Sequence, residues 1–219
     1  MLRLLDRYLD PSESLLEILF GLIMALTMTA GARLLSDPDE IRRLDLALGL
    51  LGCNVAWGLI DAVFYLLGSQ FNRNRRVRFT RRLQGAASDE EAIGLVREEF
   101  GLEGEPQASQ EDREALHRSL LAFFRDATAE RAPFSRDELM AAIIIFVLVT
   151  CTALPGLLPL MAVPSTNLAL RIANALQVIL LLGVGYRWAH YTGISGWRGA
   201  MIVGTLGVAL VLVAVALGG

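Results

Sequence analysis

The chain has 219 residues, of which 54% are apolar and 20% are charged, and its mean hydropathy is +0.48. A soluble domain of this length is usually less apolar and more charged, so this composition excludes a disordered chain and disfavours an ordinary cytosolic enzyme. The formal net charge is −3, and every one of the 20 basic residues is an arginine.

Five apolar segments of membrane length follow one another along the chain. About 20 residues are needed, because a helix rises 1.5 Å per residue and the hydrocarbon core is about 30 Å thick. The segments are 15–35, 44–68, 139–163, 168–188 and 199–219. They predict an all-α polytopic membrane protein with five transmembrane helices. Residues 1–83 would hold the first two helices, 84–138 a water-facing insert, and 139–219 the last three.

The distribution of arginine predicts the orientation. Residues 71–83 contain six arginines and no acid, and such clusters stay on the cytoplasmic side. We therefore expect the N-terminus and residues 84–138 in the cytoplasm and the C-terminus on the far side of a bacterial inner membrane. Placed directly after an apolar helix, the cluster indicates a stop-transfer and headgroup anchor rather than a nucleic-acid patch. The expected partner is the lipid bilayer, and no nucleic acid is expected.

The insert is acidic, and its pattern is helical. Residues 84–138 hold 14 acids and six arginines, which gives them a net charge of 8 negative (14 − 6). Ser88 and Glu91 have the spacing of a capping box, so a helix should begin there and end at Gly101. Its apolar face would hold Ile93, Val96 and Phe100. A second helix should follow Ser109 and continue to Pro133, with an apolar stripe made of Leu116, Leu120, Phe123, Phe124 and Ala127.

Clustered carboxylates have two interpretations. The common one is a solvated acidic face, and the sharper one is a surface that collects hard metal ions. Glu114 and His117 are three residues apart, which places a carboxylate and an imidazole on one helical face. The candidate metal ligands of the insert are Glu91, Glu98, Glu99, Glu111, Glu114 and His117.

Polar residues inside the apolar segments are candidates for a cation path, because an ionisable group in a membrane helix is usually functional. Asp61 and Asn54 are seven residues apart and share a helical face. The alternative for Asp61 is a packing role, protonated or paired with an arginine. Glu13 and Glu17 lie one turn apart at the cytoplasmic entrance of the first helix and are further candidates.

The first apolar segment contains regularly spaced small residues, and the third contains two prolines. Gly21, Ala25 and Thr29 recur every four residues, which allows either a dimer or a close contact within one chain. We expect a homodimer that packs first helix on first helix. Pro155 and Pro159 predict a break in the third helix, which can line an ion site or can be a simple kink.

Four features together resemble the vacuolar iron transporter family. They are Phe20-Gly21 at the opening of a first helix that reads AGA at 30–32, the acidic insert with REEFGL at 97–102, LLP at 157–159, and the five-helix layout with a cytosolic N-terminus. The resemblance implies a homodimer with a cation path between the first helices. It also implies proton-coupled export of Fe²⁺ or Mn²⁺ from the cytosol, with carboxylates of the insert gathering the metal.

The resemblance also assigns positions in the path. Met24 stands where the family has an aspartate on its first helix, four residues after the phenylalanine of the Phe-Gly pair, and Asp61 is the carboxylate available on the second. The function implied is a divalent-cation transporter with metal as substrate and no permanently bound cofactor. The alternative is a non-transporting scaffold or metal sensor that uses the insert to bind a partner. No Ser-His-Asp set, Walker loop or dinucleotide motif occurs, so we expect no enzyme.

Overall fold

The computed structural model describes residues 7–35, 37, 41–101, 109–130 and 133–217, and among these residues it contains helices and no strand. The chain forms two compact units, a membrane unit (residues 1–66 and 136–219) and an insert unit (residues 67–135). Within the described residues, five helical spans are long and apolar enough to cross a membrane. The predicted all-α fold with five spans is therefore confirmed.

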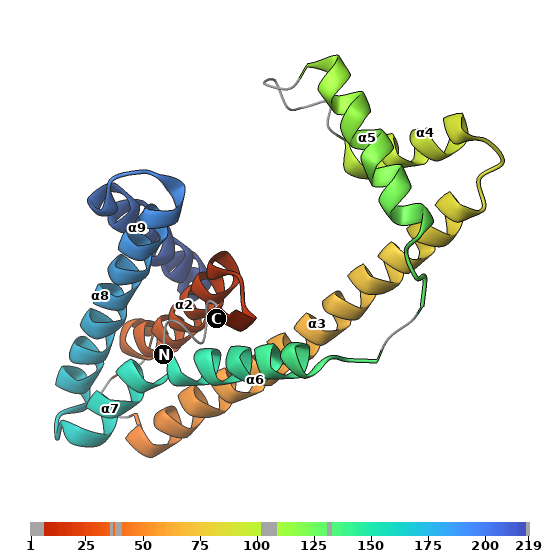
Figure 1. Ribbon diagram of the computed structural model, residues 1–219. Helices are drawn as coiled ribbons and strands as arrows, with labels where there is room; N and C mark the ends of the chain where they lie inside the picture. Colours follow the sequence, from red (N-terminus) through yellow and green to blue (C-terminus); the bar gives the residue numbers. More distant parts are fainter. Residues whose placement is uncertain (1–6, 36, 38–40, 102–108, 131–132, 218–219) are drawn as a thin grey trace. The chain divides into compact units, whose positions relative to one another are not determined.

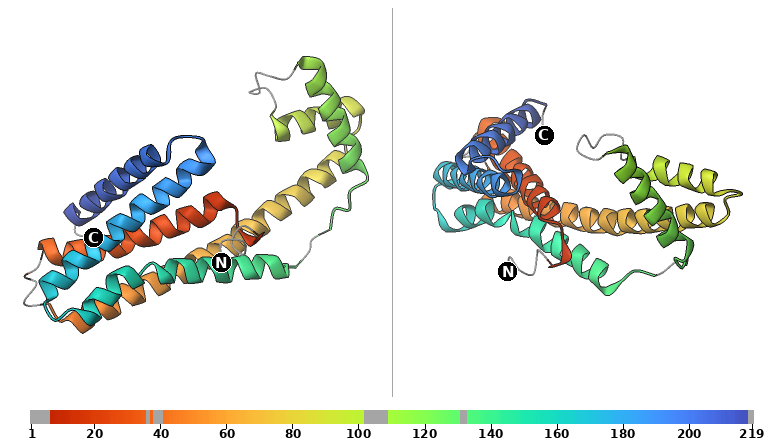
Figure 2. Two further views of the ribbon diagram at one scale, coloured as in Figure 1. Left: turned by 60° about the vertical axis from the view of Figure 1, so that its left-hand side comes forward. Right: turned by 45° about the horizontal axis from the view of Figure 1, so that its top comes forward.

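The membrane unit is built around three helices that pack side by side, α2, α8 and α9 (Figures 1 and 2). Leu22 and Leu26 of α2, Leu181 of α8 and Val211 of α9 are buried together at their centre. The helices of this unit are α2 (Pro11–Leu35), the first part of α3 (Arg43–Gln84), α6 (Arg136–Cys151), α7 (Leu154–Ala162), α8 (Thr166–Thr192) and α9 (Gly196–Ala216).

The start of α2 is fixed by Asp10. Its carboxylate accepts hydrogen bonds from the hydroxyl of Ser12 (2.7 Å) and from the backbone N–H of the same residue (2.8 Å). These bonds, the hydroxyl's above all, lower the pKa of Asp10, because they stabilise the charged form. Pro11 then occupies the first helical position, where the missing N–H costs nothing.

The third span is two helices rather than one. The α-helical pattern of α6 stops at Cys151, and α7 begins at Leu154 with Pro155 in its first turn and Pro159 inside it. At the break, the hydroxyl of Thr152 donates to the carbonyl of Val149 (2.6 Å). The break predicted from the prolines is thus present, and it brings a polar side chain into the interior of the membrane unit.

Helix α3 is much longer than its apolar segment, because it continues from Gly68 to Gln84. Residues 69–84 contain no proline or glycine, and arginine is a good helix former, so nothing in the sequence ends the helix. This extension explains why the second compact unit begins at residue 67 rather than near 84. Phe79 and Leu83 of α3 are buried with Ala92, Val96 and Leu121, and together they form the core of the insert unit.

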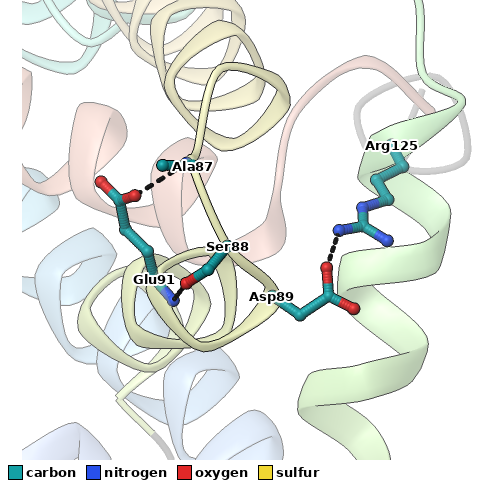
Figure 3. A network of polar contacts seen from close by, with 5 residues as sticks. All are labelled: Ala87, Ser88, Asp89, Glu91 and Arg125. Atoms are coloured by element: carbon teal, nitrogen blue, oxygen red, sulfur yellow. Dashed lines mark hydrogen bonds and ion pairs between the residues drawn. The ribbon is translucent and has the colours of Figure 1, made fainter.

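The insert unit adds α4 (Asp89–Phe100) and α5 (Gln110–Arg125) to the end of α3. The capping box of α4 is present: the Ser88 hydroxyl accepts from the N–H of Glu91 (3.2 Å), and the Glu91 carboxylate accepts from the N–H of Ala87 (2.8 Å) (Figure 3). Asp89 of the same turn pairs with Arg125 at the end of α5. The predicted end of α4 at Gly101 is also confirmed, with φ of 29°.

Helix α5 differs from the prediction in phase and in length. Leu116 and Phe123 are 46% and 69% exposed, whereas His117 and Leu121 are buried. The predicted apolar stripe is therefore correct only in part: Leu120 and Phe124 pack against the core of the insert unit. The helix starts at its expected cap, where the Ser109 hydroxyl accepts from the N–H of Asp112 (3.1 Å). The helix ends at Arg125, well before Pro133, where Gln84 of α3 contacts its last turn.

The side chain of Gln84 caps the C-terminal end of α5. Its Nε2 group donates to three carbonyls at the end of α5, those of Phe124 (3.2 Å), Arg125 (3.1 Å) and Ala127 (2.9 Å). The last carbonyls of a helix have no partner within the helix, so an amide from another element can satisfy them and let the helix stop. Gln84, the last residue of α3, therefore caps the C-terminal end of α5.

Candidate cation path in the membrane unit

Two carboxylates line one hollow of the membrane unit, Glu17 on α2 and Asp61 on α3. The hollow has a volume of about 350 Å³, and its other lining residues are apolar: Leu16, Leu19, Phe20 and Ile23. One oxygen of Asp61, Oδ2, is buried and has no hydrogen-bond partner among the described residues. An unpartnered carboxylate between membrane helices is costly, so a bound cation would be strongly stabilised here.

Phe20 forms the aromatic wall of this hollow. Its ring meets the indole of Trp57 edge to face, with centroids 5.7 Å apart, which joins α2 to α3 beside the two carboxylates. Both aromatic side chains are nevertheless about 40% exposed. Among the described residues of the membrane unit, the hollow is therefore open to the surface at its apolar rim.

Glu13 and Met24 flank the hollow without lining it. Glu13 lies one turn before Glu17 on α2 and is exposed. Met24 lies one turn after Phe20 and is half-buried. By helical spacing, the two residues extend the face of α2 that carries Glu17 and Phe20 in both directions.

Asn54, the remaining candidate of the path, lies outside this hollow. It is fully buried and does not line the hollow, although it lies two turns from Asp61 on α3. Its Nδ2 group donates to Thr152 Oγ1 (2.9 Å) and to the carbonyls of Val149 (3.2 Å) and Gly21 (3.4 Å). Asn54 thus connects α3 to α2 and to the break between α6 and α7 through hydrogen bonds.

The small residues of α2 also serve the interior of one chain. A Cβ atom on Gly21 would lie 2.2 Å from Thr152 Oγ1, Ala25 is packed with Leu50, and the Thr29 hydroxyl donates to Gln177 Oε1 (2.9 Å). All three small residues are buried. This face of α2 is therefore covered by other helices of the same chain, and the homodimer expected from the sequence stays a prediction.

Sequence reasoning missed the two buried polar contacts that hold these helices together. Asn54 meets Thr152 across 98 residues of sequence, and Thr29 meets Gln177 across 148. The available signal was the presence of amide and hydroxyl side chains in apolar segments, which favours hydrogen bonds between helices. It did not reveal which side chains would pair.

The predicted metal ligands of the insert are not gathered within one chain. Glu91 accepts at the α4 cap, Glu99 pairs with Arg75 (2.9 Å), and Glu114 lies 3.7 Å from both Arg97 and Arg118. Across the residues that the structure describes, no three His, Cys, Asp or Glu side chains are placed to hold one metal ion. Two further acids of the insert, Glu103 and Glu105, lie outside the described residues.

The remaining candidates of the insert differ in exposure. Glu98 and Glu111 are exposed to solvent, on α4 and α5 respectively. His117 is only 6% exposed, and neither of its ring nitrogens has a hydrogen-bond partner in the described part of the chain. The exposed acids are available to cations from solution, whereas the imidazole is packed inside the unit.

Comparison with known protein families decides the relationship, because a model of the VIT family matches residues 69–219. The chain belongs to the VIT family, the vacuolar iron transporters. No curated protein matches it at a significant level. The VIT match covers the insert unit and the last three spans and begins within α3, so Glu17 and Asp61 precede the matched region.

Membership of the VIT family, together with the five apolar helices, indicates an integral membrane protein of a class that transports metal ions. The geometry fits this class. The two carboxylates of the hollow come from separate membrane helices, and Asp61 Oδ2 has no hydrogen-bond partner among the described residues. Of the five candidate path residues, the structure brings Glu17 and Asp61 together in one hollow, with Glu13 and Met24 on the same helix as Glu17 and Asn54 outside the hollow.

Proposed function

We propose that this protein exports Fe²⁺ or Mn²⁺ from the cytosol in exchange for protons, with the metal as substrate and no permanently bound cofactor. The observation that carries the proposal is the hollow lined by Glu17 and Asp61, in a chain of a family of metal-ion transporters. Carboxylate oxygens are suitable ligands for divalent ions such as Mn²⁺. The apolar residues around them lower the local dielectric constant, which strengthens the attraction between the metal ion and each carboxylate.

Proton exchange follows from the chemistry of carboxylates. A carboxylate must lose its proton before it can coordinate a metal, so protons and metal compete for Glu17 and Asp61. When the metal leaves towards an acidic compartment, protonation of the same oxygens removes the unpartnered charge from the membrane interior. One pair of groups can therefore bind metal on one side and carry protons back.

A second copy of the chain completes the path in this proposal. Two carboxylates are fewer ligands than a divalent ion usually binds. A two-fold axis beside the hollow would bring Glu17 and Asp61 of the second copy close to the same pair in the first. The face of α2 that carries Glu17 also exposes Leu16 and Phe20, by 61% and 42%, and these would pack against the other copy. Glu13 would then stand at the entrance, on both chains.

The insert would deliver metal to that entrance. Its exposed acids, including Glu98 and Glu111, create a field that concentrates cations near the protein. Because no three ligands meet in the described part of one chain, metal capture in this proposal uses acids from both copies.

The orientation places these events on opposite sides of the membrane. The six arginines at 71–83 favour a cytoplasmic insert and N-terminus, with the C-terminus on the far side of a bacterial inner membrane. A reporter domain fused after Gln84 should be active only in the cytoplasm. Activity only on the outer side would contradict this orientation and the capture of cytosolic metal.

Uptake of metal into proteoliposomes tests the transport proposal. Asp61→Asn and Glu17→Gln should each reduce Mn²⁺ and Fe²⁺ flux at least tenfold, because each removes a charged ligand from the hollow. Asp45→Asn is the matched control: Asp45 lies on the same helix as Asp61, is exposed, and pairs with Arg42 (3.2 Å). Its flux should equal that of the wild type. Wild-type protein that folds, inserts and moves neither metal would instead support the scaffold or sensor function.

A further inference from the structure

The interior of the membrane unit contains polar atoms that the packing of the helices leaves without partners. Besides Asp61 Oδ2, four are buried and unpartnered among the described residues: Asn54 Oδ1, Thr150 Oγ1, Asn174 Oδ1 and Gln177 Nε2. A buried polar atom without a hydrogen bond is destabilising, and internal water usually satisfies such atoms. The four come from three helices, α3, α6 and α8, so they share a region of the unit rather than a defect of one helix.

The first part of this region runs from the hollow to the break between α6 and α7. Asp61 lines the hollow, and Gly58 lies one turn before it on α3. A Cβ atom on Gly58 would lie 3.3 Å from Thr150 Oγ1, which places the threonine of α6 against this turn of α3. Asn54, a further turn back on α3, donates to Thr152 Oγ1 at the break (2.9 Å). Polar groups therefore follow one another at each turn of α3.

The second part runs from the break towards the start of α8. Gly156 lies in the first turn of α7, and a Cβ atom on it would lie 2.8 Å from Gln177 Nε2. Gln177 Oε1 accepts from the hydroxyl of Thr29 on α2 (2.9 Å). Asn174 lies one turn before Gln177 on α8, and the exposed Arg171 lies three residues before Asn174. The polar region thus extends to the surface of the unit.

We propose that water molecules bound along this region conduct protons between Asp61 and the end of the unit where α8 begins. The region, which we call the polar line, consists of six uncharged side chains: Thr29, Asn54, Thr150, Thr152, Asn174 and Gln177. The start of α3 and the end of α7 lie at the same end, because Arg43 donates to the carbonyl of Val163 (2.6 Å). In the proposed orientation this end faces away from the cytoplasm. The proton role rests on the proposed exchange of metal and protons, whereas the bound water does not.

The proton balance follows from the groups present. At the far end, a proton from solution adds to the first water of the line. Each water or threonine hydroxyl then accepts one proton and donates another to its neighbour, and the last water protonates the carboxylate of Asp61. The side-chain amides keep their own protons and orient the waters. When metal binds in the hollow, Asp61 releases its proton through the hollow, and the carboxylate is restored.

The polar line excludes the metal ion. A divalent ion takes about six oxygen ligands and favours charged ones, and the line offers none that is charged. The helices also approach closely along it: a Cβ atom on Gly58 would lie 2.9 Å from the carbonyl oxygen of Phe146, and one on Gly156 would lie 2.8 Å from Leu50 Cδ2. A proton needs no wide passage, because it moves by exchange between hydrogen-bonded neighbours. Metal and protons therefore take separate routes that meet at Asp61.

Hydroxyl-radical labelling of the full chain in detergent, with the radicals generated from water by X-rays, tests for the bound water. Leu50 and Leu22 are both almost completely buried, but Leu50 adjoins Gln177 at Gly156 and Leu22 lies in the apolar cluster of α2, α8 and α9. Labelling of Leu50 should exceed that of Leu22 about fivefold, because radicals form from water at the site. Gln177→Leu should remove most of the excess. Equal labelling of the two leucines would overturn the proposal, whether or not the protein moves metal.

The proton role is tested by a matched pair of variants, Thr29→Val and Thr27→Val. Both remove a hydroxyl from α2, but the Thr27 hydroxyl donates to the carbonyl of Ile23 within the same helix (2.8 Å). In proteoliposomes, Thr29→Val should slow Mn²⁺ entry and the accompanying proton exit about threefold, the usual contribution of one hydrogen bond between membrane helices. Thr27→Val should slow neither. The affinity of Thr29→Val for Mn²⁺ in detergent should equal that of the wild type, because the hollow is unchanged.

Three outcomes would contradict the proton role, and each has a different meaning. Equal rates for the two variants would show that protons do not use the polar line. A loss of Mn²⁺ affinity in step with the rate would show that Thr29 shapes the metal site instead. Wild-type protein that moves no metal, yet shows the excess label on Leu50, would refute the proposed exchange and its proton route while supporting the bound water.

Discussion

Replacing Gly21 by alanine should destabilise the subunit itself. The added Cβ would lie 2.2 Å from Thr152 Oγ1, which is far inside contact distance. The hydroxyl cannot easily move away, because it accepts from Asn54 and donates to the carbonyl of Val149. Overpacking of this kind costs about 1 to 3 kcal/mol, and the better helix propensity of alanine offsets about 0.5 to 1 kcal/mol of it. We therefore expect a net loss of up to about 2.5 kcal/mol.

The measurement is the free energy of unfolding in detergent, from an SDS titration followed by circular dichroism. Gly52→Ala is the control, since a Cβ on Gly52 meets nothing within 4 Å, and it should be neutral or stabilising. Adding Thr152→Ala to Gly21→Ala should cost less than the sum of the single changes, because the clash disappears. If Gly21→Ala left unfolding unchanged but dissociated a dimer, Gly21 would be an interface residue and the packing described above would be wrong.

Two further substitutions test packing in the two units by the same titration and by hydrogen exchange. Asn54→Ala removes the amide that joins α2, α3 and α6, and we expect a loss of about 1 to 2 kcal/mol, whereas the exposed Asn72→Ala should change little. Leu121→Ala should cost about 2 to 3 kcal/mol and speed amide exchange in α4 and α5, while the exposed Leu116→Ala should have under a quarter of that effect. Equal effects of the two leucine substitutions would restore the apolar stripe expected from the sequence.

The sequence predicted those features that depend on local pattern. Apolar length located all five spans, because crossing a bilayer imposes a minimum length that few soluble segments reach. Ser88 and Glu91 predicted the start of α4, since a capping box is satisfied within a single turn. Pro155 and Pro159 predicted the break in the third span for the same local reason.

The sequence could not predict contacts between distant segments. The stripe assigned to α5 included Leu116 and missed Leu121, because helical periodicity alone cannot fix which side of a helix meets its partner. The small residues of α2 allowed two interpretations, and their contacts with Thr152, Leu50 and Gln177 favour the one within a single chain. The insert acids look like a metal cluster in sequence, yet arginines such as Arg75 take several of their carboxylates.

The central claim is that metal and protons exchange at Glu17 and Asp61. The most direct measurement follows Mn²⁺ entry and internal pH together, in proteoliposomes with an acidic interior. We predict that each Mn²⁺ taken up is accompanied by proton exit, that Mg²⁺ produces far less of either, and that Asp61→Asn abolishes both while Asp45→Asn abolishes neither. Metal entry without proton movement, or equal coupling in wild type and Asp61→Asn, would contradict the account.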